Sequence, residues 1–141
     1  MKNKIYDPWV GKHLTIDAYG IKRSKLEHHK NIFDMLEGLP ARLGMRKLTE
    51  PHLVFVDDKK SKHGDYGLSG FIMLYESHIS CHTWPELGYV AMDVYSCQNF
   101  DEKKVLRYLK QYWGYCIKNR TLPSYRMRII IQQLLKGASK E

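Results

Sequence analysis

Hydrophobic and polar residues follow two different periods along the chain, and each period predicts a type of element. Residues 13–19 alternate with period two, which is typical of a strand with one buried face. Residues 24–39 repeat their apolar positions at helical spacing and predict one amphipathic helix. Its expected start is a capping box and its expected stop is a pair of helix breakers, namely Ser24 with Glu27 and Gly38 with Pro40.

Strand patterns dominate the centre of the chain. Short β-prone runs at 53–56, 71–75 and 89–95 predict three strands, and a charged loop is expected over 57–67. Residues 85–88 carry turn chemistry, so the stretch from the second run to the third predicts a β-hairpin.

Two further elements are expected after the hairpin. An apolar stripe over 105–113 predicts a helix capped by Asn99 or Asp101. Residues 125–135 are ambiguous, because three consecutive isoleucines favour a strand whereas the length and a possible cap favour a helix, and we expect a helix. This order of elements predicts an α+β fold, a two-layer sandwich in which an antiparallel sheet carries its helices on one face.

The hairpin register can be counted from its turn. If Trp84 faces Tyr89, the other facing pairs are His82 with Ala91, Ser80 with Asp93, His78 with Tyr95, and Glu76 with Cys97. Cys97 then lies beside the Glu76-Ser77 peptide bond. Side chains alternate along a strand, so Ser77 is expected to point away from the face that carries the histidines. A register slip, a bulge or a chain break at Ser77 would each change this, and the pattern leaves the choice open.

Composition indicates one globular domain over residues 1–141. Apolar residues make up 43% of the chain, and no apolar run has the length of a membrane span or the form of a signal-peptide core. Three cysteines argue against a disulfide framework and for a reducing compartment, so we expect a cytoplasmic protein. The net charge of +8 is scattered and accompanies no nucleic-acid motif, so neither nucleic acid nor a membrane is an expected partner.

Chemistry-bearing residues gather between Ser69 and Cys97. The segment 76–86, ESHISCHTWPE, followed by Gly88-Tyr89, Asp93 and Cys97, resembles the small prokaryotic S-adenosylmethionine decarboxylases. Two earlier segments match the same family: GLSG at 67–70, and GKHL at 11–14 with Asp17 and Tyr19-Gly20.

The resemblance implies a proenzyme that cleaves itself between Glu76 and Ser77 into a β chain, 1–76, and an α chain, 77–141. Ser77 would become a pyruvoyl group, a self-generated cofactor whose ketone forms a Schiff base with the substrate amine and accepts the electrons released with carbon dioxide. The same resemblance implies the family's two-layer sandwich and a homodimer of cleaved protomers with active sites between them.

Roles for single residues also follow from the resemblance. It assigns self-processing to Ser69 and His82, proton donation in the decarboxylation to Cys97, and ribose binding to Glu86. A thiol with a pKa of about 8.5 is mostly protonated at neutral pH and can return a proton to carbon. The family usually places an aromatic residue in the loop over 57–67 to stack on adenine. Counting back without gaps puts His63 there, and Tyr66 is the alternative if the loop is shifted.

Each of these residues has a plainer interpretation when it is taken alone. A strand serine, a half-buried histidine, a buried cysteine and a turn glutamate are common without any function, and only the constellation favours one. Zinc is a second interpretation, because His78, Cys81, His82 and Cys97 are all ligand types. Their spacing suits a metal poorly and no Cys-x-x-Cys occurs, so we expect no metal. Cys81 stands where relatives commonly have an aliphatic residue.

Three functions compete at this point. The first is pyruvoyl-dependent decarboxylation of S-adenosylmethionine, which supplies spermidine synthesis in polyamine biosynthesis. The second is the same chemistry on another amino acid, such as arginine or ornithine, because His63 departs from the usual aromatic residue. The third is an unprocessed, non-enzymatic relative.

Overall fold

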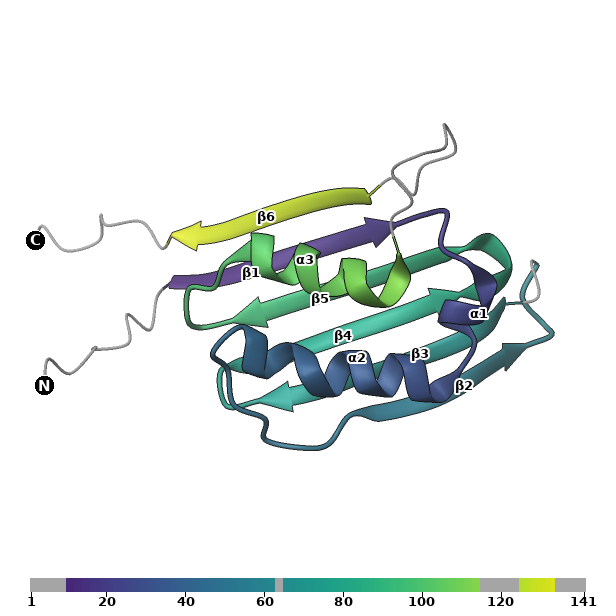
Figure 1. Cartoon of the computed structure of the whole chain (residues 1–141), viewed down its shortest axis with the longest axis horizontal. Coiled ribbons are helices and arrows are strands. Elements are labelled where there is room, and N and C mark those ends of the chain that lie inside the picture. The colour runs from purple at the N-terminus through teal and green to yellow at the C-terminus, as the bar shows by residue number, and fades with distance from the viewer. Residues whose placement is uncertain (1–9, 63–64, 115–124, 134–141) are drawn as a thin grey trace, which may run out of the picture.

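A six-stranded antiparallel sheet forms the centre of the molecule, in the order β2-β3-β4-β5-β1-β6 (Figure 1). The computed structural model describes the backbone of residues 10–62, 65–114 and 125–133, and the side chains of 11–62 and 65–114. The strands are β1 (Val10–Ala18), β2 (His52–Asp58), β3 (Asp65–Leu74), β4 (Ser77–Trp84), β5 (Tyr89–Ser96) and β6 (Tyr125–Gln133).

The helices lie together on one face of this sheet (Figure 1). They are α1 (Arg23–Leu26), α2 (His29–Arg42) and α3 (Glu102–Trp113), and a short 3-10 turn, η1 (Pro85–Leu87), joins β4 to β5. The expected α+β two-layer sandwich is therefore confirmed. Within the described ranges, no helix is long and apolar enough to cross a membrane.

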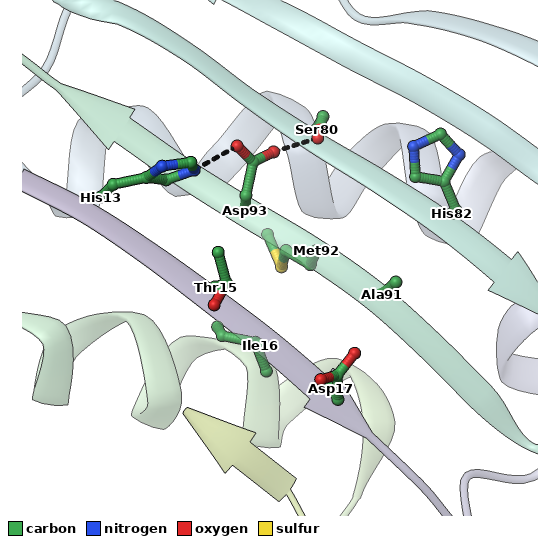
Figure 2. Close-up of a pocket in the computed structure, with 9 residues that line it drawn as sticks. All are labelled: His13, Thr15, Ile16, Asp17, Ser80, His82, Ala91, Met92 and Asp93. Carbon is green, nitrogen blue, oxygen red and sulfur yellow. Dashed lines mark hydrogen bonds and ion pairs between the residues drawn. The ribbon is translucent and has the colours of Figure 1, made fainter. Parts of the chain in front are cut away.

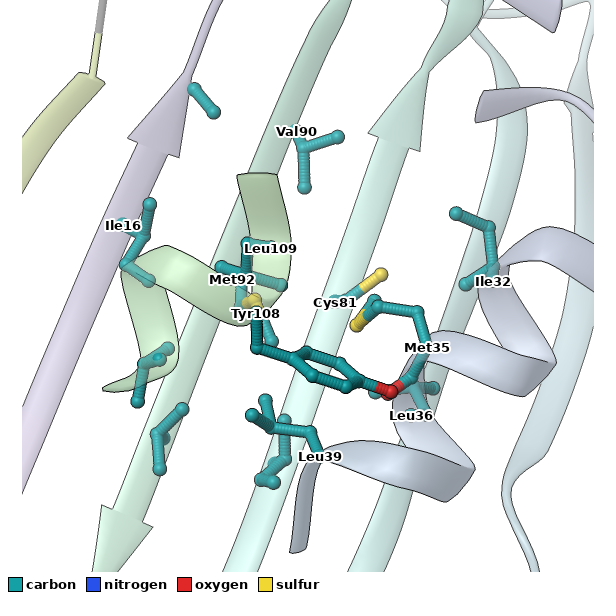
Figure 3. Packing of buried hydrophobic residues seen from close by; sticks show 14 of the residues in the cluster. Ile16, Ile32, Met35, Leu36, Leu39, Cys81, Val90, Met92, Tyr108 and Leu109 are labelled. Atoms are coloured by element: carbon teal, nitrogen blue, oxygen red, sulfur yellow. The ribbon is translucent and has the colours of Figure 1, made fainter. Parts of the chain in front are cut away.

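The hydrophobic core fills the space between the helices and the sheet (Figure 3). Alternate residues of the central strands point into it, as the period-two pattern requires. Ile32, Met35, Leu36 and Leu39 of α2 meet them from the helical layer, and all four are at most 1% exposed. The other face of the sheet is not covered by any described helix. We call it the open face.

The predicted hairpin register is confirmed at every pair between His78 and Trp84. His82 pairs with Ala91, Ser80 with Asp93, and His78 with Tyr95. The Glu76–Cys97 pair continues the ladder, because the Cys97 N–H donates to the Glu76 carbonyl oxygen over 2.9 Å. The ladder also runs through Ser77, which pairs with Ser96, so neither a slip nor a bulge occurs there.

The single helix expected over 24–39 is wrong, because the chain forms two helices there. His28 has an extended conformation, with φ −92° and ψ 121°, and separates α1 from α2. Leu26 and Ile32 are both buried, but six residues of continuous helix would turn them to different sides. The break lets both reach the core. Ser24 does not cap α1, whose N-cap is Lys22.

The predicted stop of this helix was placed too early. Pro40 lies inside the last turn of α2, which ends at Arg42. Gly38 serves a close approach instead of a helix end: a Cβ there would lie 2.3 Å from the Tyr108 hydroxyl oxygen of α3. The predicted cap of α3 is confirmed, since the Asp101 side chain accepts a hydrogen bond from the Lys103 N–H.

The helix expected over 125–135 is also wrong. Residues 125–133 form β6, which pairs with β1 in antiparallel register. Strand pairing with an edge of the sheet overrode the weak helix signal, and the isoleucine run had indicated it. The other strands are longer than predicted, so β2 and β3 take up both ends of the loop expected over 57–67.

Candidate active site

Strand β4 carries most of the predicted site and separates it from the core by simple alternation. Ile79, Cys81 and Thr83 are buried under the helices. The alternate residues lie on the open face: His78, Ser80, His82 and Trp84. Cys81 is therefore a core residue although it precedes His82 in the sequence. Burial raises the pKa of its thiol to about 12, which keeps the thiol neutral.

Ser77 begins β4 with a strained backbone. Its φ is 145°, and among the residues that the structure describes it is the one non-glycine residue with a positive φ. Conformations of this kind cost of order 1–3 kcal/mol for a residue with a side chain and persist only where the surroundings impose them. The strain thus falls on the residue that follows the predicted scissile bond.

Cys97 lies beside this strained residue, as the register predicted. Its backbone N–H holds the carbonyl oxygen of Glu76, and its side chain is exposed and forms no disulfide. An N–H aimed at a carbonyl oxygen stabilises negative charge that develops there. The contact therefore suits nucleophilic attack on the Glu76 carbonyl carbon.

The Glu76 side chain is buried, with a residue exposure of 2%. Two atoms of Arg46 hold its carboxylate: the backbone N–H at 3.0 Å and Nε at 3.2 Å. A buried carboxylate needs such partners, because an unpaired charge in the interior is strongly unfavourable. Arg46 was not among the residues that the sequence singled out.

Ser69 and His82 meet at the other end of β4. They face each other across the β3–β4 ladder, and Ser69 Oγ lies 2.9 Å from His82 Nδ1. A serine hydroxyl paired with an imidazole can relay a proton. A hollow of about 160 Å³ opens beside them, and Tyr66 and Trp84 are among the residues that line it.

A polar network occupies the open face between these two ends (Figure 2). Asp93 lies at its centre, with His13 Nε2 at 2.6 Å and His78 Nε2 at 3.2 Å from Oδ2, and the Ser80 hydroxyl bound to Oδ1. Burial alone would raise the pKa of the Asp93 carboxyl, but the bonds from Ser80 and the histidines lower it below its ordinary value. A hollow of about 340 Å³ follows the same face toward His82.

Three aromatic rings stack at the His82 end. Tyr89 stacks with both Tyr19 and Trp84. Its ring centroid lies 4.8 Å from that of Tyr19 and 5.0 Å from that of Trp84. Burial, together with a 2.7 Å hydrogen bond to Asp17, raises the pKa of Tyr89 to about 12. The ring faces make a flat apolar surface of the kind on which planar ligands stack.

Glu86 lies in η1, just beyond this aromatic stack. Its side chain is 61% exposed and forms a 2.7 Å ion pair with Arg23. The carboxylate is thus accessible from the solvent while its partner holds it in place. His63, the predicted adenine-stacking residue, lies outside the described residues.

Comparison with known families decides the class of protein. The family model described as S-adenosylmethionine decarboxylase matches residues 12–117, which is most of the chain. The chain belongs to the S-adenosylmethionine decarboxylase family. The expectation drawn from the segment 76–86 is therefore confirmed.

Individual relatives agree with this family. The S-adenosylmethionine decarboxylase proenzyme of Persephonella marina is 40% identical over 88 residues, covering 62% of this chain and 60% of the relative. That of Clostridium botulinum strain Langeland is 34% identical over 104 residues, covering 73% and 83%. The match thus spans about 60% of the length of the first relative and more of the second.

A solved structure has a fold similar to that of this chain. The crystal structure of the adenosylmethionine decarboxylase from Aquifex aeolicus matches with a TM-score of 0.69 at 24% identity. The match covers 94% of this chain and 98% of that one. At this identity, the likeness establishes the two-layer architecture.

The predicted site of this decarboxylase-family chain is divided within one copy. Ser77 and Cys97 lie together at the start of β4, and Ser69 lies with His82 near its end. His82 follows Ser77 by five residue steps of extended strand, which corresponds to about 17 Å. One chain therefore does not bring the two pairs into contact along β4.

Alternation separates the residues that suggested the zinc interpretation. Cys81 points into the core, whereas His78 and His82 lie on the open face. Among the described residues, no group of three or more His, Cys, Asp or Glu is arranged to hold a metal ion.

Sequence reasoning missed two parts of the site. Arg46 precedes Glu76 by thirty positions, and no local pattern connects the two residues. His13 belongs to the GKHL match and Asp93 to the motif, so their pairing could have been proposed from the family match together with the strand order.

Proposed function

We propose that this chain is a pyruvoyl-dependent decarboxylase of S-adenosylmethionine that acts in polyamine synthesis after cleaving its own Glu76–Ser77 bond. The observation that carries the proposal is the strained φ of Ser77, next to a carbonyl oxygen that the Cys97 N–H already holds. This geometry lies at the serine that the sequence resemblance assigns to the pyruvoyl group, within the segment that the family model matches.

The cleavage uses groups of the chain itself. Ser77 Oγ attacks the Glu76 carbonyl carbon, the bond to the Ser77 nitrogen breaks, and the hydroxyl proton ends on that nitrogen. Loss of the Ser77 Cα hydrogen then breaks the bond from Cβ to Oγ and releases the Glu76 carboxylate. Water replaces the nitrogen, which leaves as ammonia, and a pyruvoyl group remains. The Cys97 N–H stabilises the oxyanion of the first step.

The residues at the start of β4 fit such a group. A free thiol, an N–H donor and a strained backbone meet there. When present, the pyruvoyl group supplies a ketone that binds the substrate amine and accepts the electrons released with carbon dioxide. Cys97 is in place to return a proton to the substrate α-carbon. A reducing cytoplasm keeps its thiol free for this role.

A homodimer completes the site. Because Ser77 and His82 lie about 17 Å apart along one strand, we assign Ser69 and His82 to the Ser77 of a second copy. The open face supports this assembly, since beside its polar network it presents exposed apolar side chains: Val54, Phe71, Met73 and Tyr75. Each cleaved protomer consists of a β chain, 1–76, and an α chain, 77–141.

The substrate occupies the region between the two ends. Glu86 offers an exposed carboxylate for the ribose hydroxyls. Tyr66 lines the hollow beside His82 and is the described candidate for stacking on adenine, while His63 keeps that role if the loop is not shifted. The matched family favours S-adenosylmethionine over arginine or ornithine.

Intact mass under denaturing conditions tests the proposal. We expect the wild-type chain to give two products whose boundary is Glu76–Ser77, with an α chain that lacks a free amino terminus. Ser77→Ala leaves one uncut chain without activity, whereas the exposed-serine control Ser24→Ala is cut normally. Carbon dioxide release is then measured with S-adenosylmethionine, arginine and ornithine. An uncut, inactive wild-type chain would mean a non-enzymatic relative, and release from arginine or ornithine alone would reassign the substrate.

A further inference from the structure

We infer that Arg46 is a positioning residue for self-cleavage, which it assists by clamping Glu76, and that it afterwards retains the new end of the β chain. The inference rests on the proposed function, because it concerns the same Glu76–Ser77 bond. It adds a residue outside the segment 76–97 that carries the motif.

The clamp acts on a buried charge. Glu76 is the one carboxylate among the buried polar residues of the described chain, and Arg46 binds it through both backbone and side chain. The Arg46 side chain is itself 66% exposed, so it reaches from the surface onto the buried carboxylate. Loss of the guanidinium leaves Glu76 with one fewer donor in a buried place, where each unmet bond is costly.

The residues just before Glu76 also hold Arg46 in position. Its carbonyl oxygen accepts from the Tyr75 N–H over 3.1 Å, and its guanidinium carbon lies 4.6 Å from the centre of the Tyr75 ring. The contact continues at the next residue, because Lys47 forms an isolated antiparallel β-bridge with Leu74. The segment around Arg46 therefore packs along the last residues before the scissile bond.

Glu76 is consequently fixed on both sides of its Cα. Arg46 holds the side chain and the Cys97 N–H holds the carbonyl oxygen, while Ser77 directly after it has a φ of 145°. A strained φ relaxes when neighbouring peptide units rotate, and these contacts oppose rotation of Glu76. The clamp thus keeps the carbonyl carbon in position for the Ser77 hydroxyl.

The first chemical step is the one that this clamp favours. In that step, the Glu76 carbon forms a bond to Ser77 Oγ and loses its bond to the Ser77 nitrogen, which takes the hydroxyl proton. The later elimination removes a hydrogen from Ser77 Cα and depends less on how Glu76 is oriented. After elimination, Glu76 carries a second carboxylate at the new chain end, and a guanidinium with five N–H donors can serve both.

Cleavage kinetics of freshly synthesised full-length chain test the inference. We expect Arg46→Met to slow cleavage about tenfold or more, since a hydrogen bond to a charged group contributes about 1.5–3 kcal/mol and 1.36 kcal/mol is tenfold in rate. Arg46→Lys restores part of the rate. Arg42→Met is the matched control, because Arg42 of α2 makes a similar contact with the Tyr108 ring of α3, and both residues are far in sequence from the bond.

A double-mutant cycle separates positioning from general stability. In a Glu76→Gln background the buried charge is gone, so Arg46→Met is expected to slow cleavage much less than it does in the wild-type background. Hydroxylamine, which splits an ester into a hydroxamate and a free serine amino terminus, is expected not to restore the Arg46→Met rate, because the ester forms slowly. Folding of each variant is checked by its thermal unfolding midpoint.

The outcomes distinguish this inference from the proposed function. Wild-type cleavage with equally fast Arg46→Met cleavage, equal slowing in both backgrounds, or full rescue by hydroxylamine overturns the role of Arg46 and leaves the proposed function intact. A wild-type chain that stays whole overturns both.

Discussion

The two ends of β4 differ in how tightly the chain holds them. At the Ser77 end, Ser77 is strained and its neighbour Glu76 is buried and bonded through side chain and backbone. At the His82 end, the imidazole is exposed, is hydrogen-bonded to Ser69 across the ladder and lies near the Trp84 ring. The tightly bonded Ser77 end is suited to be cleaved, and the exposed His82 end is suited to act on another molecule. This contrast is the reason for proposing a homodimer in which the Ser77 end of one copy meets the His82 end of the other.

Co-expression of two inactive variants tests the contrast most strongly. Each variant lacks one of the two reactive side chains, the Ser77 hydroxyl in Ser77→Ala and the imidazole in His82→Ala. In the proposed mixed dimer, one of the two sites combines Ser77 from one copy with His82 from the other. With random two-fold pairing, roughly a quarter of the wild-type activity is expected to return. Cut α chain is quantified by mass after tagging the two variants differently. Absence of any cut chain in a folded mixture would place both ends in one protomer.

Removal of the Cys97 thiol has the next largest expected effect. Cys97→Ala keeps the backbone N–H that holds the Glu76 carbonyl, so cleavage proceeds. Turnover is expected to fall by about 100-fold or more, the usual contribution of a positioned general acid. Single-turnover carbon dioxide release measures it, with Cys81→Ala as the buried-thiol control. An unchanged kcat would remove Cys97 from proton donation.

A smaller change is expected at the accessible end. Glu86→Gln weakens a charged hydrogen bond to ribose and is expected to raise KM for S-adenosylmethionine about tenfold, with cleavage unaffected. Glu27→Gln is the matched control, because Glu27 also forms an ion pair with Arg23 but lies at the end of α1 and not in η1. Equal KM values for the two variants would dissociate Glu86 from the substrate.

The smallest expected effect is a difference in alkylation rate between Cys81 and Cys97, the two cysteines that the structure describes. Burial raises the pKa of Cys81 to about 12, so at pH 8 its thiol is protonated and shielded in the folded protein. Cys97 is exposed. Iodoacetamide at pH 8 is expected to label Cys97 and to spare Cys81 until denaturant is added, as peptide mapping measures. Rapid labelling of native Cys81 would contradict its place in the core.

Much of the fold followed from local patterns. The strand periods, the turn at 85–88 and the Asp101 cap were sufficient for the hairpin register and the helix that follows it. The errors arose where tertiary contacts compete with local signals. The split at His28 depends on burying both Leu26 and Ile32, and β6 depends on an edge of β1 that only the assembled sheet provides.

The sequence by itself determined the family and the adjacency of Cys97 to the Glu76–Ser77 bond, because motif spacing and a two-residue strand period are properties of the chain alone. Only the tertiary structure decided the strain at Ser77, the Arg46 clamp and the separation of Ser77 from His82. The physical reason is that backbone strain and buried ion pairs exist only when segments distant in sequence are packed against each other.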